Sequence, residues 1–315
     1  MSNAIEWADT HIPAQDGRRV LITGANSGIG LAAARLLARR GAQVVLTSRD
    51  EQRGRDALRK VAAAAAGPAP ELLRLDLAAL DDVRRAAAEL RARHGHLDVL
   101  VNNAGVMGTP RRRTADGFEL QFGTNHLGHF ALTGLLLPAL LAARQPRVVT
   151  VSSNMHRRGR MRFDDLNWQH GYHPWEAYSQ SKLANLLFTF ELQRRAARAG
   201  LALAALAAHP GYAATNLQDR RSQMTGQMLV TRLVRVANAL FAQDAVHGAL
   251  PTVAAAALPD AAGGDYWGPG GRTQTRGLPA RVAPASAATD LAAAERLWTL
   301  SVQLTGVTFD GLAGS

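Results

Sequence analysis

The chain has 315 residues, 47% of them hydrophobic, and it contains no cysteine, which excludes disulfide bonds and thiolate metal sites and fits a reducing compartment. The formal net charge is +11, but the arginines are dispersed and not interleaved with aromatic residues, so we expect a solvated surface and no nucleic-acid partner. The residues before 19 lack the apolar core of a signal peptide or membrane anchor. We therefore expect a cytoplasmic protein without a membrane anchor.

A strand, a glycine-rich turn and a helix are predicted at the start of the chain. The apolar run 19–23 is typical of a buried strand, and the helical pattern 31–40 stops at Gly41. Glycines between them permit a tight turn and a close approach to a pyrophosphate, which the helix N-terminus attracts. An ordinary glycine-rich turn is the alternative. The cofactor contacts predicted here are Gly24, Asn26, Ser27, Gly28, Ile29 and Gly30.

The second predicted strand, 43–48, ends where a dinucleotide fold distinguishes its two nicotinamide cofactors. A carboxylate at this point would bind the ribose 2′-hydroxyl of NAD, but the chain has Ser48 followed by Arg49. A small hydroxyl and a fixed cation suit a 2′-phosphate, so NADP(H) is the predicted cofactor and NAD(H) the less favoured one. Asp50 and Glu51 are expected to begin the next helix, because carboxylates suit a helix N-terminus.

Longer helical patterns separate four further predicted strands, at 71–76, 97–101, 147–152 and 201–207. This alternation predicts an α/β fold: a Rossmann-type, doubly wound parallel sheet with helices on both faces. Since no repeat or low-complexity linker interrupts it, we expect one domain over 1–315. The long apolar stretch 127–143 contains His, Gly and Pro, and it is predicted to be a buried helix rather than a membrane span.

A rare lysine marks the second half of the chain. Of the 36 basic residues, 34 are arginine, and the lysines are Lys60 and Lys182. Lys182 follows Tyr178 by four positions, which places both side chains on one face of a helix. Lysine is a compact point charge that can lie between a phenol and sugar hydroxyls, whereas the arginine fork is planar and wide. The pair therefore indicates a catalytic role; a solvated helix face is the alternative.

Several segments, taken in order, carry a family resemblance. They are 23–30 (TGANSGIG), 75–77 (LDL), 98–105 (DVLVNNAG), 124–130 (TNHLGHF), 151–153 (VSS), 178–182 (YSQSK) and 209–211 (HPG). Together they resemble the short-chain dehydrogenase/reductase family over about 18–309. Segments 125–129, 181–185 and 264–271 are similar to its retinol dehydrogenase-like and protochlorophyllide reductase-like branch. The resemblance implies an NADP(H)-dependent alcohol dehydrogenase or carbonyl reductase acting on an alcohol, ketone or aldehyde, and a homodimer or homotetramer.

The resemblance also implies four catalytic residues. Tyr178 would be the general acid/base, and Lys182 would lower the pKa of its phenol and bind the nicotinamide ribose. Ser153 would hydrogen-bond the substrate oxygen, with Ser152 as the alternative. Asn125 would hold a helix backbone carbonyl and a water that extends the proton relay from Lys182, or it would only cap a helix.

Further cofactor contacts follow from the other segments of the resemblance. Asp76 would hydrogen-bond the adenine amine, and Leu77 would line the ring. The remaining implied contacts are Asn103, Ala104, Gly105, Pro210, Gly211 and Thr215, of which Thr215 would reach the nicotinamide carboxamide or a phosphate. No metal site is predicted, because His126, His129 and His209 lack metal-ligand spacing; each is expected to pack in the core or a loop.

Two regions depart from the shortest family pattern. Ser153 and Tyr178 are 25 positions apart, about twice the usual family gap, so the stretch 154–176 contains an insertion. Its aromatic side chains predict a substrate lid, or packing against a neighbouring loop or subunit; they include Phe163, Trp168, Tyr172 and Trp175. Apolar residues at helical spacing in 218–242 predict a cover over an apolar substrate, with ordinary core packing as the alternative.

A second hypothesis belongs to a different class: a non-catalytic NADP-binding or sensing protein on the same scaffold. The combined presence of Asn125, Ser153, Tyr178 and Lys182 argues against it, because a protein that only binds the cofactor does not need the whole set.

Overall fold

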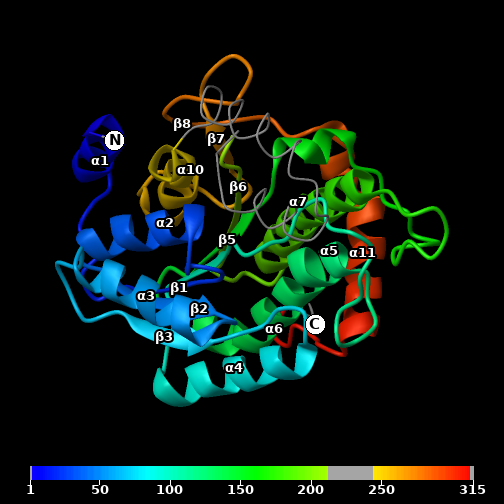
Figure 1. The fold of residues 1–315 in the computed structure, drawn as a ribbon, viewed down its shortest axis with the longest axis horizontal. Helices are drawn as coiled ribbons and strands as arrows, with labels where there is room; N and C mark the ends of the chain where they lie inside the picture. The colour runs from blue at the N-terminus through cyan, green and yellow to red at the C-terminus, as the bar shows by residue number, and fades with distance from the viewer. Residues whose placement is uncertain (1, 212–243, 313–315) are drawn as a thin grey trace.

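The computed structural model describes residues 2–211 and 244–312. Its centre is an eight-stranded sheet with the order β3-β2-β1-β4-β5-β6-β7-β8 (Figure 1). The strands are β1 (Arg19–Ile22), β2 (Gln43–Ser48), β3 (Glu71–Arg74), β4 (Val99–Asn102), β5 (Arg147–Val151), β6 (Ala204–Ala208), β7 (Tyr266–Pro269) and β8 (Pro279–Arg281). Neighbouring strands pair in parallel except β7 and β8. The predicted doubly wound Rossmann-type α/β fold is confirmed.

Helices cover both faces of this sheet (Figure 1). They are α1 (Ser2–His11), α2 (Gly28–Arg39), α3 (Glu51–Ala62), α4 (Leu80–Arg93), α5 (Leu120–Phe122), α6 (Gly128–Leu141), α7 (Pro174–Arg198), α10 (Ala245–Ala257) and α11 (Leu291–Thr305). Short helical turns are η1 (Gly123–Leu127), η2 (Asn154–Arg158) and η3 (Ser286–Thr289).

Alternation along each strand divides the core between the two faces. Val20 and Ile22 pack in one cluster with α2 and α10, while Leu21 packs in the opposite cluster with α4 and α6. Because both faces are covered, β1 is apolar at successive positions rather than alternating with polar residues. Each side chain of this size contributes about 1.5–3 kcal/mol when it is fully buried.

The structure adds elements that the sequence did not predict. Strands β7 and β8 extend the sheet past β6, and α1 packs against α10 through Ala4 and Ala8. Helix α3 ends at Ala62, the first residue of the alanine run 62–66. The stretch 127–143 forms the buried helix α6, as predicted. In the described ranges, no helix is both long and apolar enough to span a bilayer.

A π-helical turn sets the position of α6 relative to the sheet. Turn η1 runs directly into α6, and the Gly128 N–H donates to the Gly123 carbonyl across five residues. A β-carbon at Gly128 would lie 2.5 Å from the Leu77 backbone oxygen, so the start of α6 passes close to the segment that follows β3. This wider turn contains Asn125 and brings it to the carboxyl edge of the strands.

Candidate active site

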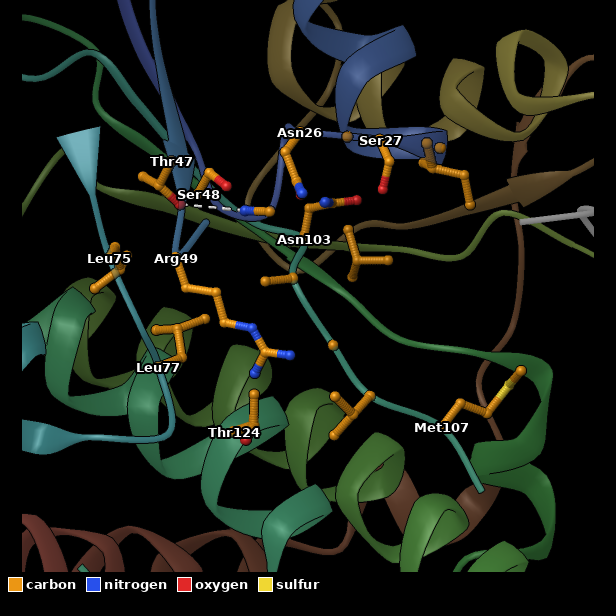
Figure 2. Close-up of a pocket in the computed structure, with 18 of the residues that line it drawn as sticks. Asn26, Ser27, Thr47, Ser48, Arg49, Leu75, Leu77, Asn103, Met107 and Thr124 are labelled. Carbon is orange, nitrogen blue, oxygen red and sulfur yellow. Dashed lines mark hydrogen bonds between the residues drawn. The ribbon is translucent and has the colours of Figure 1, made fainter. Parts of the chain in front are cut away.

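A cleft of about 280 Å³ lies at the carboxyl edge of the parallel strands, near β1 and β4 where the strand order reverses (Figure 2). The predicted residues that line it are Gly24, Asn26, Ser27, Gly28, Ile29, Gly30, Ser48, Arg49, Asp76, Leu77, Asn103, Ala104, Gly105, Tyr178, Lys182 and Pro210. Three other predicted residues, Asn125, Ser153 and Gly211, are not among its lining residues. Thr215 and the stretch 218–242 lie outside the described residues.

The glycine turn leaves an open helix N-terminus at this cleft. Gly24 and Gly28 have φ values of 65° and 57°, which favour glycine, and a β-carbon on Gly24 would lie 2.8 Å from the Ala104 β-carbon. Ser27 precedes α2 without a side-chain capping bond, and the first turn of α2 has no acidic residue. The N–H groups of this turn are therefore left to an anionic ligand such as a pyrophosphate.

At the end of β2, the chain caps the next helix itself. Asp50 accepts a hydrogen bond from the Arg53 N–H and Glu51 begins α3, which confirms the predicted helix start. The Ser48 hydroxyl donates to the Asp50 carbonyl at 2.7 Å. Arg49 points into the cleft (Figure 2), and Arg53, which sequence reasoning missed, also lines it.

The ends of β3 and β4 are held by side chains. Asp76 accepts the Ala78 N–H through Oδ1, and its own N–H donates to Asp82. Asn103 donates from Nδ2 to the Thr23 carbonyl at 2.7 Å, so its amide braces the end of β1 while the residue borders the cleft. These bonds fix the strand ends from which cofactor contacts are predicted.

Asn125 organises the segment that follows β4. Its Nδ2 donates to the Val106 carbonyl and to Ser181 Oγ, both at 2.9 Å, and its Oδ1 accepts the Val106 N–H at 2.8 Å. A β-carbon on Gly105 would lie 3.2 Å from Asn125 Oδ1 and 3.5 Å from Lys182 Nζ. Asn125 and Lys182 therefore both lie close to Gly105, on the side to which a β-carbon would point, and the Asn125 side chain does more than cap a helix.

The two serines after β5 have different neighbours. Ser152 is buried and donates to the Lys182 carbonyl at 2.8 Å, so its hydroxyl serves the backbone of α7. Ser153 accepts the Met155 N–H at the start of η2, and it also hydrogen-bonds the Tyr178 phenol. Of the two alternatives, Ser153 is therefore the serine beside the phenol.

Burial controls the charges of Tyr178 and Lys182. Burial raises the pKa of Tyr178 to about 12, and the hydrogen bond from Ser153 opposes part of this rise. Burial lowers the pKa of Lys182 to about 8. Lys182 Nζ donates to the Val151 carbonyl and lies 5.8 Å from the centre of the Tyr178 ring, and the expectation that Lys182 lowers the pKa of the phenol stays a prediction. Tyr178 is a protonated phenol at neutral pH.

Aromatic residues anchor the stretch 154–176 to the chain. Trp168 is 2% exposed, and the Tyr172 hydroxyl donates to the Thr109 carbonyl at 2.8 Å. The Trp175 ring meets the Tyr178 ring edge-on, with 6.3 Å between their centres. These are contacts with neighbouring segments of the same chain, and a lid function of this stretch stays a prediction.

The predicted packing of three histidines is confirmed, since His126, His129 and His209 are all buried. Burial lowers the pKa of His126 to about 3, of His129 to about 4 and of His209 to about 3, so all three are neutral at physiological pH. Across 2–211 and 244–312, no cluster of His, Cys, Asp or Glu side chains is suited to hold a metal ion.

Comparison with known proteins gives a consistent family assignment. Residues 18–226 match the family described as short chain dehydrogenase. Retinol dehydrogenase 14 of Mus musculus is 40% identical, over 92% of this chain and 86% of the relative. Polyprenol dehydrogenase of Mus musculus is 41% identical, over 94% of this chain and 86% of that protein.

Solved structures agree with these relatives. An uncharacterized protein from Mycobacterium paratuberculosis has 46% identity and a TM-score of 0.79, covering 96% of this chain and 98% of its own. A short chain dehydrogenase from Escherichia coli CFT073, complexed with NADPH, has 27% identity and a TM-score of 0.53, covering 67% and 82%. The chain belongs to the short-chain dehydrogenase family of oxidoreductases, in its retinol dehydrogenase-like branch.

Proposed function

We propose that this protein is an NADP(H)-dependent oxidoreductase that transfers a hydride between nicotinamide and the alcohol or carbonyl group of an apolar small molecule. One observation carries the proposal. Tyr178 lies beside Ser153 and on one helix face with Lys182, next to a cleft that also contains an uncapped helix N-terminus. The cleft therefore offers a proton donor and an anion site together.

The cleft residues fit a dinucleotide phosphate. The uncapped start of α2 suits the pyrophosphate, and Ser48 with Arg49 and Arg53 suits a 2′-phosphate, since no carboxylate stands at position 48. The NADPH complex of the Escherichia coli relative supports this cofactor. Asp76 and Leu77 are proposed for the adenine, and Pro210, Gly211 and Thr215 for the nicotinamide. When bound, the nicotinamide supplies or accepts the hydride.

Tyr178 is proposed to move the proton that accompanies the hydride. In the reducing direction, the substrate oxygen gains the electron pair of its broken π bond and takes the phenolic proton. A pKa of about 12 keeps this proton on the phenol until it is transferred. Ser153 would hydrogen-bond the same oxygen. Lys182 would hold the nicotinamide ribose and resupply the proton through a water that the backbone carbonyl of Asn125 would hold.

The proposed substrates are apolar alcohols and aldehydes of the retinoid or polyprenol kind. The names of two relatives, retinol dehydrogenase and polyprenol dehydrogenase, support this class. Met107 lines the cleft well away from Arg49 (Figure 2), and it gives this part of the cleft an apolar side chain. We further propose a cytoplasmic homodimer or homotetramer, with a core over about 18–309 and a substrate cover over 218–242.

The test is to replace Tyr178 by phenylalanine, which removes only the hydroxyl. Retinal reduction by NADPH should fall by at least ~10²-fold, the scale of general acid catalysis, while the dissociation constant of NADPH changes little. Lys182→Arg should be almost as damaging, because the planar fork cannot take the place of a point charge. Near-normal turnover in Tyr178→Phe contradicts the mechanism. A wild-type protein that binds NADPH but reduces neither retinal nor a polyprenal supports the non-catalytic alternative.

A further inference from the structure

A buried histidine joins the glycine turn to the π-helical turn. His129 lies in the first turn of α6, and its ring contacts two elements. Its Nδ1 is 2.9 Å from the backbone carbonyl oxygen of Asn125, and its Nε2 is 2.9 Å from the hydroxyl oxygen of Thr23. Thr23 directly precedes Gly24, so the ring spans from the cofactor turn to the helix that carries Asn125.

Counting protons around Thr23 assigns the tautomer of His129. The Thr23 hydroxyl oxygen accepts the N–H groups of Asn103, which it shares with the Val101 carbonyl, and of Ala104, both at 2.9 Å. With two N–H groups directed at its lone pairs, the oxygen has none left for a third donor. It can then only donate, and the shorter contact, 2.9 Å to His129 Nε2 against 3.3 Å to the Val101 carbonyl, assigns its proton to Nε2. Since Nε2 must be the acceptor and the ring is neutral, the proton is on Nδ1 and is donated to the Asn125 carbonyl.

We propose that His129 is a positioning residue for the proton relay: its Nδ1–H fixes the Asn125 carbonyl, and Thr23 fixes the ring. The inference rests on the proposed function, in which this carbonyl holds the water that extends the relay from Lys182. The ring nitrogen of His129 binds the Asn125 carbonyl oxygen at 2.9 Å and so restrains the direction of this oxygen. Because Thr23 also binds the backbone after β4, the carbonyl is aligned with the strand ends that border the cofactor cleft.

His126 provides a matched control on the same helical stretch. It is as buried as His129, but its Nε2 contacts Ser301 Oγ at 2.8 Å on α11, away from the glycine turn. A general requirement for a buried imidazole predicts similar effects at both positions. A positioning role predicts that His129 alone affects the relay.

The tautomer can be measured without turnover. In the NADPH complex of protein labelled with ring-¹⁵N histidine, the His129 signal (identified by its loss in His129→Asn) should show a protonated Nδ1 and an unprotonated Nε2 from about pH 6 to 8. An Nε2–H tautomer, or titration of this ring within that range, overturns the inference.

Turnover tests the relay itself. His129→Leu should lower kcat for retinal reduction by about tenfold or more and shift its pH profile, with the dissociation constant of NADPH within about threefold of wild type. His129→Asn should recover most of the rate, because its amide can donate from the place of Nδ1. His126→Leu should lower the melting temperature but keep the wild-type kcat profile. A wild-type profile in His129→Leu, or equal losses in His129→Leu and His129→Asn, overturns the proposal.

Two further variants keep the result interpretable. If His129→Leu does not fold, His129→Gln places its amide near Nε2, keeps the Thr23 contact and should still show the low kcat. Tyr178→Phe, run in parallel, separates the two proposals. If Tyr178→Phe loses turnover and His129→Leu does not, only the positioning role of His129 is contradicted. If Tyr178→Phe keeps its turnover, the proposed function itself is contradicted.

Discussion

Helices α2 and α3 begin in the same structural setting, but their N-termini are capped differently. Both follow neighbouring parallel strands, β1 and β2, and both start at the carboxyl edge of the sheet. At α3, Asp50 accepts the Arg53 N–H at 2.9 Å and Glu51 adds a second carboxylate. At α2, Ser27 makes no capping bond and no acidic residue follows.

The difference separates what the chain does for its own stability from what it leaves to a ligand. Each helix N-terminus carries unsatisfied N–H groups and a partial positive charge. The chain neutralises this charge at α3, where a capping side chain contributes about 1 kcal/mol. At α2 the chain makes no such capping bond, and the cleft lies at this helix N-terminus. The uncapped helix marks the binding site more directly than the glycines do.

The largest effect is expected when α2 is given the cap that α3 has. Ser27→Asp should weaken NADPH binding by about 10²-fold, since a carboxylate against a pyrophosphate costs several kcal/mol. The cofactor-free protein should meanwhile gain about 1 kcal/mol in free energy of unfolding. Fluorescence titration and chemical denaturation measure the two effects. Ser27→Asn, which caps without charge, is the control, and wild-type affinity in Ser27→Asp contradicts the comparison.

Lys182 is a second case in which a proposed functional group lowers the stability of the fold, because its ammonium is buried. A pKa lowered from 10.5 to about 8 corresponds to at most about 3.5 kcal/mol of destabilisation, at about 1.4 kcal/mol per pKa unit. Lys182→Met should therefore raise the free energy of unfolding by about 1–2 kcal/mol at pH 7, while Asn185 still donates to the Val151 carbonyl.

The pH dependence gives the sign of this effect. Below pH 8 the folded protein holds a buried ammonium, so the destabilisation is complete there. Between pH 8 and 10.5 the folded state has already released the proton that the unfolded chain still binds, so wild type gains stability relative to Lys182→Met as pH rises. Parallel denaturation curves with a constant difference between the two proteins contradict this account.

A smaller change is expected at the end of β2. Ser48→Asp should reverse the preference for NADPH over NADH, with about a tenfold loss of NADPH affinity, because the carboxylate faces the 2′-phosphate. The two dissociation constants, measured for wild type and variant, check it. Equal wild-type affinities for NADPH and NADH refute the assignment of Ser48 and Arg49.

The smallest effect is expected at the capped helix. Asp50→Ala removes the acceptor for the Arg53 N–H and should lower the free energy of unfolding by about 1 kcal/mol. NADPH affinity should not fall, because Asp50 serves the helix and adds no favourable charge to the phosphates. A tenfold loss of NADPH affinity in Asp50→Ala contradicts the distinction between α3, capped by the chain, and α2, left to the ligand.

Local patterns were sufficient for the elements that carry their own signals. The strands at 19–23 and 43–48 were predicted to within a residue, since each is an apolar run bounded by polar residues. Strand β7, with Gly268 and Pro269 among its four residues, has no such pattern and forms because β6 offers it a pairing edge. The sequence could not reveal β7 or β8, whose pairing depends on tertiary contacts.

At the site, residue types were easier to predict than their bonds. Lys182 and Tyr178 were placed together by their spacing, but the effect of burial on both pKa values depends on how the whole chain packs. The π-helical turn around Asn125 has no local sequence signal, so the role inferred for His129 required the three-dimensional contacts. Arg53 was missed because an exposed helix arginine resembles many others in this chain.

The uncapped start of α2 also makes the stability of the native state depend on the concentration of its ligand. A ligand that binds only the native state adds RT ln(1 + [L]/Kd) to its stability, about 2.7 kcal/mol at a concentration of 100 Kd. Since Ser27 makes no capping bond, the proposed dinucleotide would supply part of the resistance to unfolding when it binds. A cell with a depleted NADPH pool would then lose this protein to proteolysis sooner, and its abundance would follow the supply of reducing equivalents.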